Sequence, residues 1–147
     1  MNNMLKRLCM AIYIKQIKSR VTKKDIFQII RNSATQTKTI DLSDTIIQDL
    51  ILREKDGSTR IAKHTVMPHV IADYVQKNMI LIIRLDHPVQ WLDKGKVQTI
   101  IVLLIRQNDS YLETFLEMCC DELFLKELSQ AQYSVTDIQL LIDKKEK

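Results

Sequence analysis

The sequence predicts an α/β fold in which a mixed central β-sheet is flanked by helices on both faces. Two nearly continuous apolar runs, residues 78–85 and 97–106, are rich in β-branched residues, which is typical of strands buried on both faces. Segments with helical periodicity come before and after these runs. Only two glycines and two prolines occur among 147 residues, so few positions interrupt regular elements. This order of helices, central strands and helices indicates a sheet between two helical layers.

The first part of the chain is predicted to form one strand and two helices. Residues 12–17 carry a short strand pattern. Thr22 with Asp25 is typical of a helix N-cap, and one apolar face follows it, made of Ile26, Ile29, Ile30 and Ala34. Ser43, with Asp44 in the first turn, indicates the start of a second helix that ends before Gly57. The apolar stripe of this helix consists of Ile46, Ile47, Leu50 and Ile51.

The second half of the chain is predicted to form a hairpin and two helices. Residues 87–95 contain Pro88 and Gly95, which indicates a short connection or hairpin with Trp91 near it. A helical pattern follows the second apolar run, with apolar residues at Leu112, Phe115, Leu116, Cys119 and Leu123. Ser134 and Asp137 open a last helix whose tail, residues 144–147, is expected to fray. Its buried face consists of Val135, Ile138, Leu141 and Ile142.

Positive charge is concentrated at the N-terminus. The formal net charge is +4, yet residues 1–24 carry seven Lys or Arg and no Asp or Glu, whereas the other 123 residues carry 15 basic and 18 acidic side chains. We therefore divide the chain into a basic N-terminal extension, residues 1–19, and one domain, residues 20–147. A nucleic-acid-binding role would rest on the extension alone, because the domain body lacks a basic surface pattern with aromatic residues.

The sequence gives no sign of export, of a membrane span or of a metal site. Lys6 and Arg7 precede a seven-residue apolar stretch that ends at Lys15, which is too short to span a membrane and lacks a cleavage pattern. The spacing of Cys9, Cys119 and Cys120 fits neither a metal site nor a disulfide framework. The three histidines match no zinc motif. We expect a cytoplasmic protein without a cofactor or metal.

The segment Ser58–Val70 is the strongest candidate for a functional site, because Pro68 stands directly before His69. The proline fixes its own φ and biases the residue before it towards extended geometry, so His69 is expected to leave a strand at a defined angle. A neutral imidazole keeps a free ring nitrogen that accepts a phosphoryl or acyl group. Arg53 is expected to stabilise the charge of such a group, and Thr59 to add a hydroxyl donor. The alternative is that His69 is an ordinary exposed or core histidine.

Residues 52–69, LREKDGSTRIAKHTVMPH, resemble the active-site segment of the mannitol/fructose-type EIIA domains of the bacterial phosphoenolpyruvate-dependent sugar phosphotransferase system. An Arg-Glu helix end, a Ser-Thr pair and a Pro-His ending recur there in this order. The resemblance continues through VQWLDKGKVQTIIVLLI, YLETFLEMCCDEL and the last helix, from about residue 20 to residue 143. It implies the mixed sheet and flanking helices that the periodicity predicts independently.

The resemblance also implies a function. The histidine that matches His69 receives a phosphoryl group from the phosphocarrier protein HPr and passes it to a cysteine of an EIIB partner, for sugar uptake. By the same matching, Arg53 would hold the phosphoryl oxygens. The chain departs from the family at Ala62 and His64, where relatives have glycines, and at Tyr111, where they often have a second histidine. In this function Thr59, His64 and Tyr111 are expected to be auxiliary residues, and the hydroxyl of Tyr111 could donate a hydrogen bond to a phosphoryl oxygen. The departures leave open a second hypothesis, a regulatory EIIA-like interaction module without a role in transport, related to the EIIA-like domain of transcription regulators that respond to the phosphotransferase system.

Overall fold

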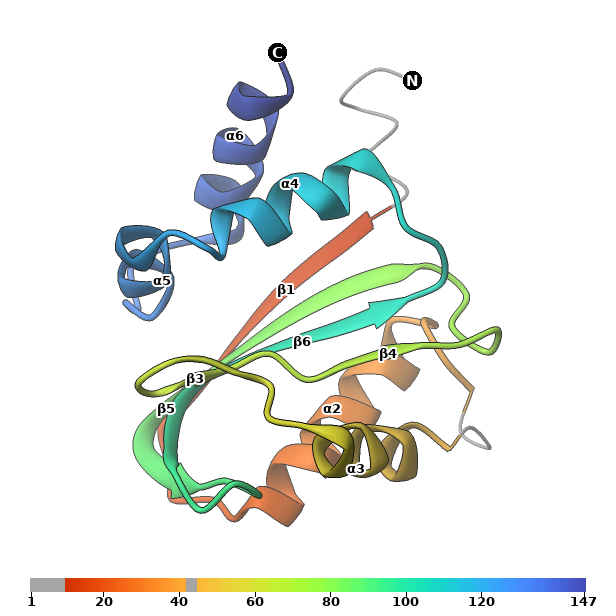
Figure 1. The fold of residues 1–147 in the computed structure, drawn as a ribbon, viewed down its shortest axis with the longest axis vertical. Coiled ribbons are helices and arrows are strands. Elements are labelled where there is room, and N and C mark those ends of the chain that lie inside the picture. Colours follow the sequence, from red (N-terminus) through yellow and green to blue (C-terminus); the bar gives the residue numbers. More distant parts are fainter. Residues whose placement is uncertain (1–9, 42–44) are drawn as a thin grey trace.

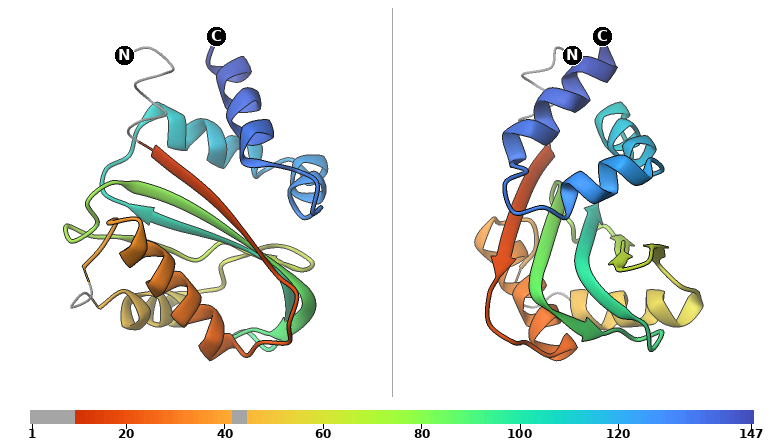
Figure 2. Two further views of the ribbon diagram at one scale, coloured as in Figure 1. Left: turned by 180° about the vertical axis from the view of Figure 1, so that it is seen from behind. Right: turned by 90° about the vertical axis from the view of Figure 1, so that its left-hand side faces the viewer.

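The structure is a computed structural model that describes residues 10–41 and 45–147. In chain order its elements are β1 (Met10–Ile17), α2 (Lys23–Gln36), α3 (Ile46–Asp56), β2 (Arg60–Ala62), β3 (Thr65–Val66), β4 (His69–Ile71), β5 (Asn78–Gln90), β6 (Lys96–Ile105), α4 (Ser110–Met118), α5 (Glu122–Leu128) and α6 (Val135–Glu146). Helices α2 and α3 lie on one side of the sheet and α4, α5 and α6 on the other (Figure 1, Figure 2). The predicted fold class is therefore confirmed. None of the helices in the described ranges is long and apolar enough to cross a membrane.

The sheet is mixed and has six strands. Five strands follow the order β1-β5-β6-β3-β2, and β4 also pairs with β6. The pairs β1–β5, β3–β6 and β4–β6 are parallel, whereas β5–β6 and β2–β3 are antiparallel. The short strands β3 and β4 occupy successive stretches of one edge of β6, since Thr65 pairs with Thr99 and His69 with Leu103. This arrangement carries the 58–71 segment along the edge of the central hairpin.

Alternation along β5 and β6 supplies two separate apolar cores. Met79, Leu81 and Ile83 pack with α2 and α3, whereas Ile80 and Ile82 pack with α4, α5 and α6. Residues 78–85 are buried without exception, which explains their nearly continuous apolar sequence. Among them, Arg84 is only 3% exposed. Its guanidinium donates to backbone carbonyls in the connection from α5 to α6, those of Leu128 (2.7 Å), Ala131 (3.3 Å) and Tyr133 (2.5 Å).

The N-terminal boundary differs from the one drawn from charge. Residues 10–17, placed in the basic extension, form β1 and pair with β5 along their whole length. The packing of β1 decides this, because Ile12 lies in one apolar cluster and Tyr13 and Ile17 pack against the other, whereas Lys15 and Gln16 are exposed. The strand predicted at 12–17 is confirmed, but the sheet that it joins begins before residue 20. The charges of Lys15 and its neighbours are therefore surface features of the domain itself.

Local capping signals locate the helix starts. The predicted capping box of Thr22 and Asp25 opens α2, with Asp25 N donating to Thr22 Oγ1 (3.1 Å) and Thr22 N to Asp25 Oδ2 (2.9 Å). Ser134 and Asp137 form the same box at α6. The predicted start at Ser43 and Asp44 lies outside the described residues, and the described helix begins at Ile46 behind Thr45.

The region expected to form one helix after β6 forms two. Helix α4 ends at Met118, and Asp121 starts α5 by accepting a hydrogen bond from Leu123 N at 2.9 Å. Because the new helix resets the rotation, Leu123 is 71% exposed and does not lie on the predicted buried face. The predicted fraying of residues 144–147 is also wrong. Helix α6 runs to Glu146, whose carboxylate accepts a hydrogen bond from Thr114 of α4 at 2.8 Å.

The β5–β6 connection is shorter than the predicted segment of residues 87–95. Strand β5 continues through Pro88 to Gln90, with a register shift between Arg84 and Val89 that accommodates the missing N–H of the proline. The turn itself spans Trp91 to Gly95, closed by a hydrogen bond of 2.8 Å from Trp91 N to Gly95 O. Trp91 is 1% exposed, so the turn is anchored in the core.

Candidate functional site

His69 begins β4 and faces the end of α3. Helix α3 packs against β4, which brings the last turn of the helix next to the imidazole. Arg53 Nε donates to His69 Nε2 at 3.3 Å, and Arg53 Nη1 donates to the carbonyl of Gly57 at 3.1 Å. The guanidinium of Arg53 is therefore hydrogen-bonded to the backbone after α3 on one side and to the imidazole of His69 on the other. The two residues that the sequence selected for phosphoryl chemistry are in direct contact.

The other ring nitrogen of His69 faces a backbone carbonyl. His69 Nδ1 lies 3.3 Å from Met67 O. A carbonyl oxygen can only accept a hydrogen bond, and the Nε–H of arginine can only donate one. In the neutral ring both contacts are satisfied only when Nδ1 carries the proton and Nε2 presents its lone pair to Arg53. The surroundings thus select one tautomer and leave the lone pair of Nε2 facing Arg53.

Pro68 sets the path that makes this possible. It lies between the residue whose carbonyl receives Nδ1 and the histidine itself. Its own carbonyl accepts a hydrogen bond of 3.0 Å from Leu103 N on β6, which continues the parallel pairing of β4. The missing N–H of the proline is not needed there, and its restricted φ fixes the angle at which β4 starts. His69 thus begins a strand, whereas the sequence led us to expect that it leaves one, and the role of the proline in aiming the imidazole stays a prediction.

An open depression of about 470 Å³ adjoins the imidazole. It is lined by α3 and β4, with Asp49, Leu52, Arg53, Asp56, His69, Val70, Ile71 and Ala72. Leu52 is 56% exposed and Ile71 is 70% exposed, so an apolar rim faces solvent beside the hydrogen-bonded Arg53 and His69. Asp49 is held on the rim by the hydroxyl of Tyr74, which donates to Oδ2 at 2.5 Å. A large, flat and partly apolar opening suits a protein partner better than a small molecule.

Two of the predicted auxiliary residues lie away from this depression. Thr59 is 5% exposed, and its hydroxyl donates to the carboxylate of Glu54. This hydrogen bond fastens the loop after α3 to the helix end. His64 lies in the turn between β2 and β3, where its side chain is exposed and its carbonyl accepts hydrogen bonds from Gln98 N and Thr99 N. Neither side chain lines the surface next to His69.

Tyr111 occupies the first turn of α4 and is 1% exposed. It belongs to the apolar cluster between the sheet and α4–α6, together with Leu103, the β6 residue that pairs with His69. The tyrosine therefore lies on the α4–α6 side of the sheet, and it is not among the residues that line the depression. As part of the packed core, it has a structural role that the sequence did not indicate.

Several residues of the site were not selected from the sequence. The Met67 carbonyl, Asp49, Asp56 and Ile71 depend on how α3 and β4 meet. Leu52 alone among the depression's apolar rim residues could have been predicted from the sequence. It lies off the apolar stripe of α3, so its side chain had to be exposed to solvent or covered by a partner.

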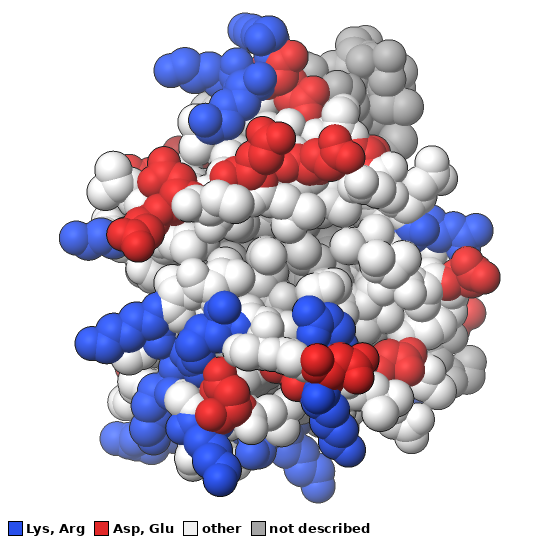
Figure 3. Space-filling model, viewed as in Figure 1, with Lys and Arg blue, Asp and Glu red and all other residues white. Residues whose placement is uncertain are grey.

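Charge is unevenly distributed over this face of the molecule. Figure 3 shows acidic side chains gathered over α4 and α5, whereas basic side chains gather around the β5–β6 hairpin and the turn between β2 and β3. The exposed lysines there are Lys63, Lys94 and Lys96. The mildly acidic domain body inferred from composition is thus divided into regions of opposite sign, and the basic region borders the segment that leads to His69.

Comparisons with known proteins identify the family of this chain. Residues 9–145 match the family model described as phosphoenolpyruvate-dependent sugar phosphotransferase system, EIIA 2. No curated protein sequence matches the chain. Among solved structures, nitrogen regulatory protein IIA-Ntr from Neisseria meningitidis has a TM-score of 0.67 at 21% identity, covering 94% of this chain and 99% of that one.

Two structures from Escherichia coli have the same fold. IIA mannitol gives a TM-score of 0.64 at 17% identity, covering 88% of this chain and 94% of that one. The complex of enzyme IIAMtl with phosphorylated enzyme IIBMtl gives 0.66 at 16% identity, covering 89% and 94%. At such identities the likeness establishes the fold, whereas the match over residues 9–145 identifies the relationship.

Proposed function

The chain belongs to the EIIA 2 family of the phosphoenolpyruvate-dependent sugar phosphotransferase system, and we propose that it accepts a phosphoryl group from HPr on His69 and transfers it to a cysteine of an EIIB partner. The observation that carries this proposal is the pair of contacts on the imidazole. Met67 O on Nδ1 and Arg53 Nε on Nε2 together support a neutral ring whose free lone pair lies beside a permanent positive charge.

The acceptor step needs little from the protein except position and charge. The lone pair of Nε2 attacks the phosphorus atom of the incoming phosphohistidine, a new N–P bond forms, and the donor N–P bond breaks with its electron pair returning to the donor ring. The proton on Nδ1 stays in place, so the Met67 carbonyl stabilises the positive charge that the imidazole ring gains. Transfer to a thiolate reverses this sequence, with an S–P bond replacing the N–P bond.

Arg53 changes partner during this step. Before transfer its Nε–H bonds to the lone pair of Nε2 at 3.3 Å. Once that lone pair forms the N–P bond, the ring nitrogen can no longer accept, and the guanidinium turns to the phosphoryl oxygens that now occupy the same place. The interaction is stronger in the phosphorylated state than in the free one, which is the requirement for a contact that favours transfer.

The apolar rim supports docking of protein donors and acceptors. Leu52 and Ile71 are exposed on opposite elements beside the nucleophile, so a partner that covers both excludes water from His69. The expected partners are HPr and an EIIB domain, and the expected location is the cytoplasm, where both would be met. The sugar that is served depends on the EIIB partner.

A second candidate function, a regulatory EIIA-like module, is favoured by the departures from the family. Tyr111 stands at the position of the second histidine, and it lies in the apolar core. A buried phenol cannot supply the positive charge of an imidazolium. In this alternative His69 is phosphorylated slowly as a signal, or HPr binds without transfer.

Phosphoryl transfer by purified enzyme I and HPr separates these functions. With phosphoenolpyruvate, the first function gives an acid-labile phosphoprotein that discharges to EIIB. The His69→Ala variant should not be labelled, whereas His64→Ala should be labelled normally because its side chain lies off the depression. Normal labelling of His69→Ala would overturn the site, and binding of HPr without labelling of the wild type would favour the regulatory module.

A further inference from the structure

A guanidinium outside the depression connects the loop before His69 to the central hairpin. We propose that the ion pair of Arg60 and Asp93 is a positioning device for His69, which holds the Met67 carbonyl against Nδ1 and thereby keeps Nε2 unprotonated. This inference rests on the proposed function, in which Nε2 accepts the phosphoryl group. Arg60 lies on β2 and Asp93 in the β5–β6 turn, 33 residues apart in sequence.

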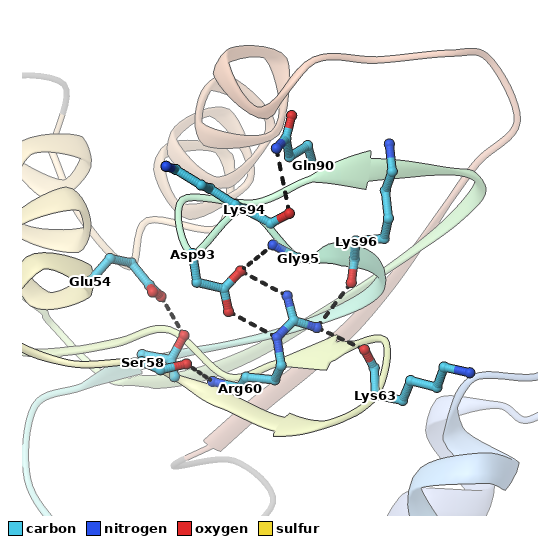
Figure 4. Close-up of polar contacts among 10 residues, drawn as sticks. Glu54, Ser58, Arg60, Lys63, Gln90, Asp93, Lys94, Gly95 and Lys96 are labelled. Carbon is cyan, nitrogen blue, oxygen red and sulfur yellow. Dashed lines mark hydrogen bonds and ion pairs between the residues drawn. The ribbon is translucent and has the colours of Figure 1, made fainter.

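All three nitrogens of the Arg60 guanidinium are engaged. Nε and Nη2 bind the two oxygens of Asp93 at 2.8 and 2.9 Å, in the two-pronged geometry that arginine forms with carboxylates. Nη1 donates to the backbone carbonyls of Lys63 and Lys96, at 2.8 and 2.9 Å. Figure 4 shows the guanidinium enclosed between the β5–β6 turn on one side and the β2–β3 turn on the other. One side chain thus joins the two turns, beside the hydrogen bonds from Gln98 N and Thr99 N to His64 O that already link the β2–β3 turn to β6.

The hairpin side of this contact is rigid. Asp93 Oδ1 also accepts a hydrogen bond from Gly95 N at 2.9 Å, and the turn is anchored by Trp91, whose ring lies 5.5 Å from that of Phe27. Gly95 leaves the space that the guanidinium occupies, because a Cβ there would lie 2.6 Å from Arg60 Nη2. The turn therefore holds the Asp93 carboxylate and the space beside Gly95 in fixed positions. The ion pair then positions the loop before His69 relative to this turn.

Hydrogen bonds lead from Arg60 to the nucleophile. The carbonyl of Thr59, directly before Arg60, accepts from Met67 N at 2.8 Å, and Arg60 itself pairs with Val66 of β3. Met67 O then faces His69 Nδ1 at 3.3 Å. The strands β2 and β3 have only three and two residues. β3 is held from one side by its pairing with β6, and the Arg60 ion pair adds a contact that holds β2.

Loss of the ion pair should therefore be measurable at the imidazole. If Met67 O moves away, either ring nitrogen can carry the proton, and a fraction of the molecules has Nε2 blocked. An ion pair that only supported the fold would change stability without changing which nitrogen of His69 is protonated. The tautomer, read from the ¹⁵N chemical shifts of the ring, distinguishes the two roles and needs no phosphoryl donor.

Three variants perturb the contact in different ways. Asp93→Asn removes the negative charge of the carboxylate. Gly95→Ala displaces the guanidinium of Arg60 without changing any charge. Arg60→Lys keeps the positive charge but cannot form the two parallel hydrogen bonds to Asp93. Asp86→Asn is the control, since Asp86 is an exposed carboxylate on β5 that accepts a hydrogen bond from Gln16 (2.7 Å). We expect the Nδ1–H form in the wild type and the control, and a mixture of tautomers in Asp93→Asn and Gly95→Ala.

Transfer from HPr should fall in parallel, by on the order of tenfold in Asp93→Asn and Gly95→Ala and less in Arg60→Lys. An unchanged tautomer and an unchanged rate in all folded variants would overturn the inference, as would an equal response of Asp86→Asn. If Asp93→Asn does not fold, Gly95→Ala and Arg60→Lys decide. A tautomer shift in a protein that HPr never labels would refute the proposed function and leave the positioning role standing.

Discussion

Replacing Arg53 by methionine tests the proposed charge stabilisation most directly. Methionine keeps an unbranched apolar stem on α3, but the donor 3.3 Å from His69 Nε2 is lost. A phosphoryl group on Nε2 would bring its oxygens to about the distance of a hydrogen bond from the guanidinium. Opposite unit charges about 4 Å apart at an effective dielectric of about 20 attract by about 4 kcal/mol.

The open side of the depression reduces this figure, because solvent screens the pair. A hydrogen bond to a charged group contributes about 1.5–3 kcal/mol net. Since about 1.36 kcal/mol corresponds to a factor of ten in rate, Arg53→Met should slow transfer about 10-fold to about 150-fold. Arg53→Lys should recover part of this loss, because an ammonium keeps the charge but not the planar fork.

Single-turnover transfer from phosphorylated HPr, followed by rapid quench, measures this rate. Lys55→Met is the matched control: it removes a positive charge from the same last turn of α3, where a cation stabilises the helix end, but its side chain does not line the depression. It should transfer within about twofold of the wild type, as a surface substitution usually does. If Arg53→Met were equally fast, or if Lys55→Met were equally slow, the assignment of Arg53 would be refuted.

Three further predictions concern stability and reactivity. Arg84→Met should lower the free energy of unfolding by about 1–3 kcal/mol in urea titrations, because the buried Leu128 carbonyl loses its donor. The carbonyls of Ala131 and Tyr133 also lose a donor, but water can hydrate them. Arg106→Met changes an exposed residue and should have less than half this effect. In a Cys9→Ser background, a thiol reagent at pH 8 should modify the exposed Cys120 and spare Cys119 until unfolding, because burial raises the pKa of Cys119 to about 12. The hydrogen bonds from Arg60 lower the pKa of Asp93 to about 2, below an unfolded value of about 3.9, so the stabilisation from this pair is complete above pH 4 and is lost as the pH falls towards 2; stability curves of wild type and Asp93→Asn should converge in that range.

The parts of the fold that could be predicted are those whose cause is local or repeated. The two central strands could be predicted because both of their faces are buried. In β5, for example, every residue from 79 to 83 is buried and apolar. The capping boxes of α2 and α6 each lie within four residues, so the sequence contains the whole interaction. Periodicity over residues 112–123 was misleading, because α4 ends at Met118 and Asp121 starts a second helix with a different rotation.

The N-terminal boundary shows why charge does not locate a domain. Lys15, the one basic residue of β1, is exposed whereas Ile12 and Ile14 pack in the core, and the density of lysines says nothing about backbone pairing. Alternation within residues 12–17 was the informative signal, and it indicated a strand. A strand needs a sheet, so that signal already contradicted a boundary at residue 20.

The site divides in the same way between side chains and backbone. His69 and Arg53 could be selected from the sequence because the chemistry of an imidazole or a guanidinium follows from the residue type alone. The choice of nucleophilic atom depends instead on a carbonyl, and every residue has one, so nothing at Met67 distinguishes it in the sequence. Its orientation follows from the loop, and the loop is held by a contact between residues 60 and 93 that only the folded sheet brings together. If the proposed positioning role holds, the reactivity of His69 is set partly by residues without phosphoryl chemistry of their own, and variants of the β5–β6 turn test the proposed nucleophile as directly as variants of the depression.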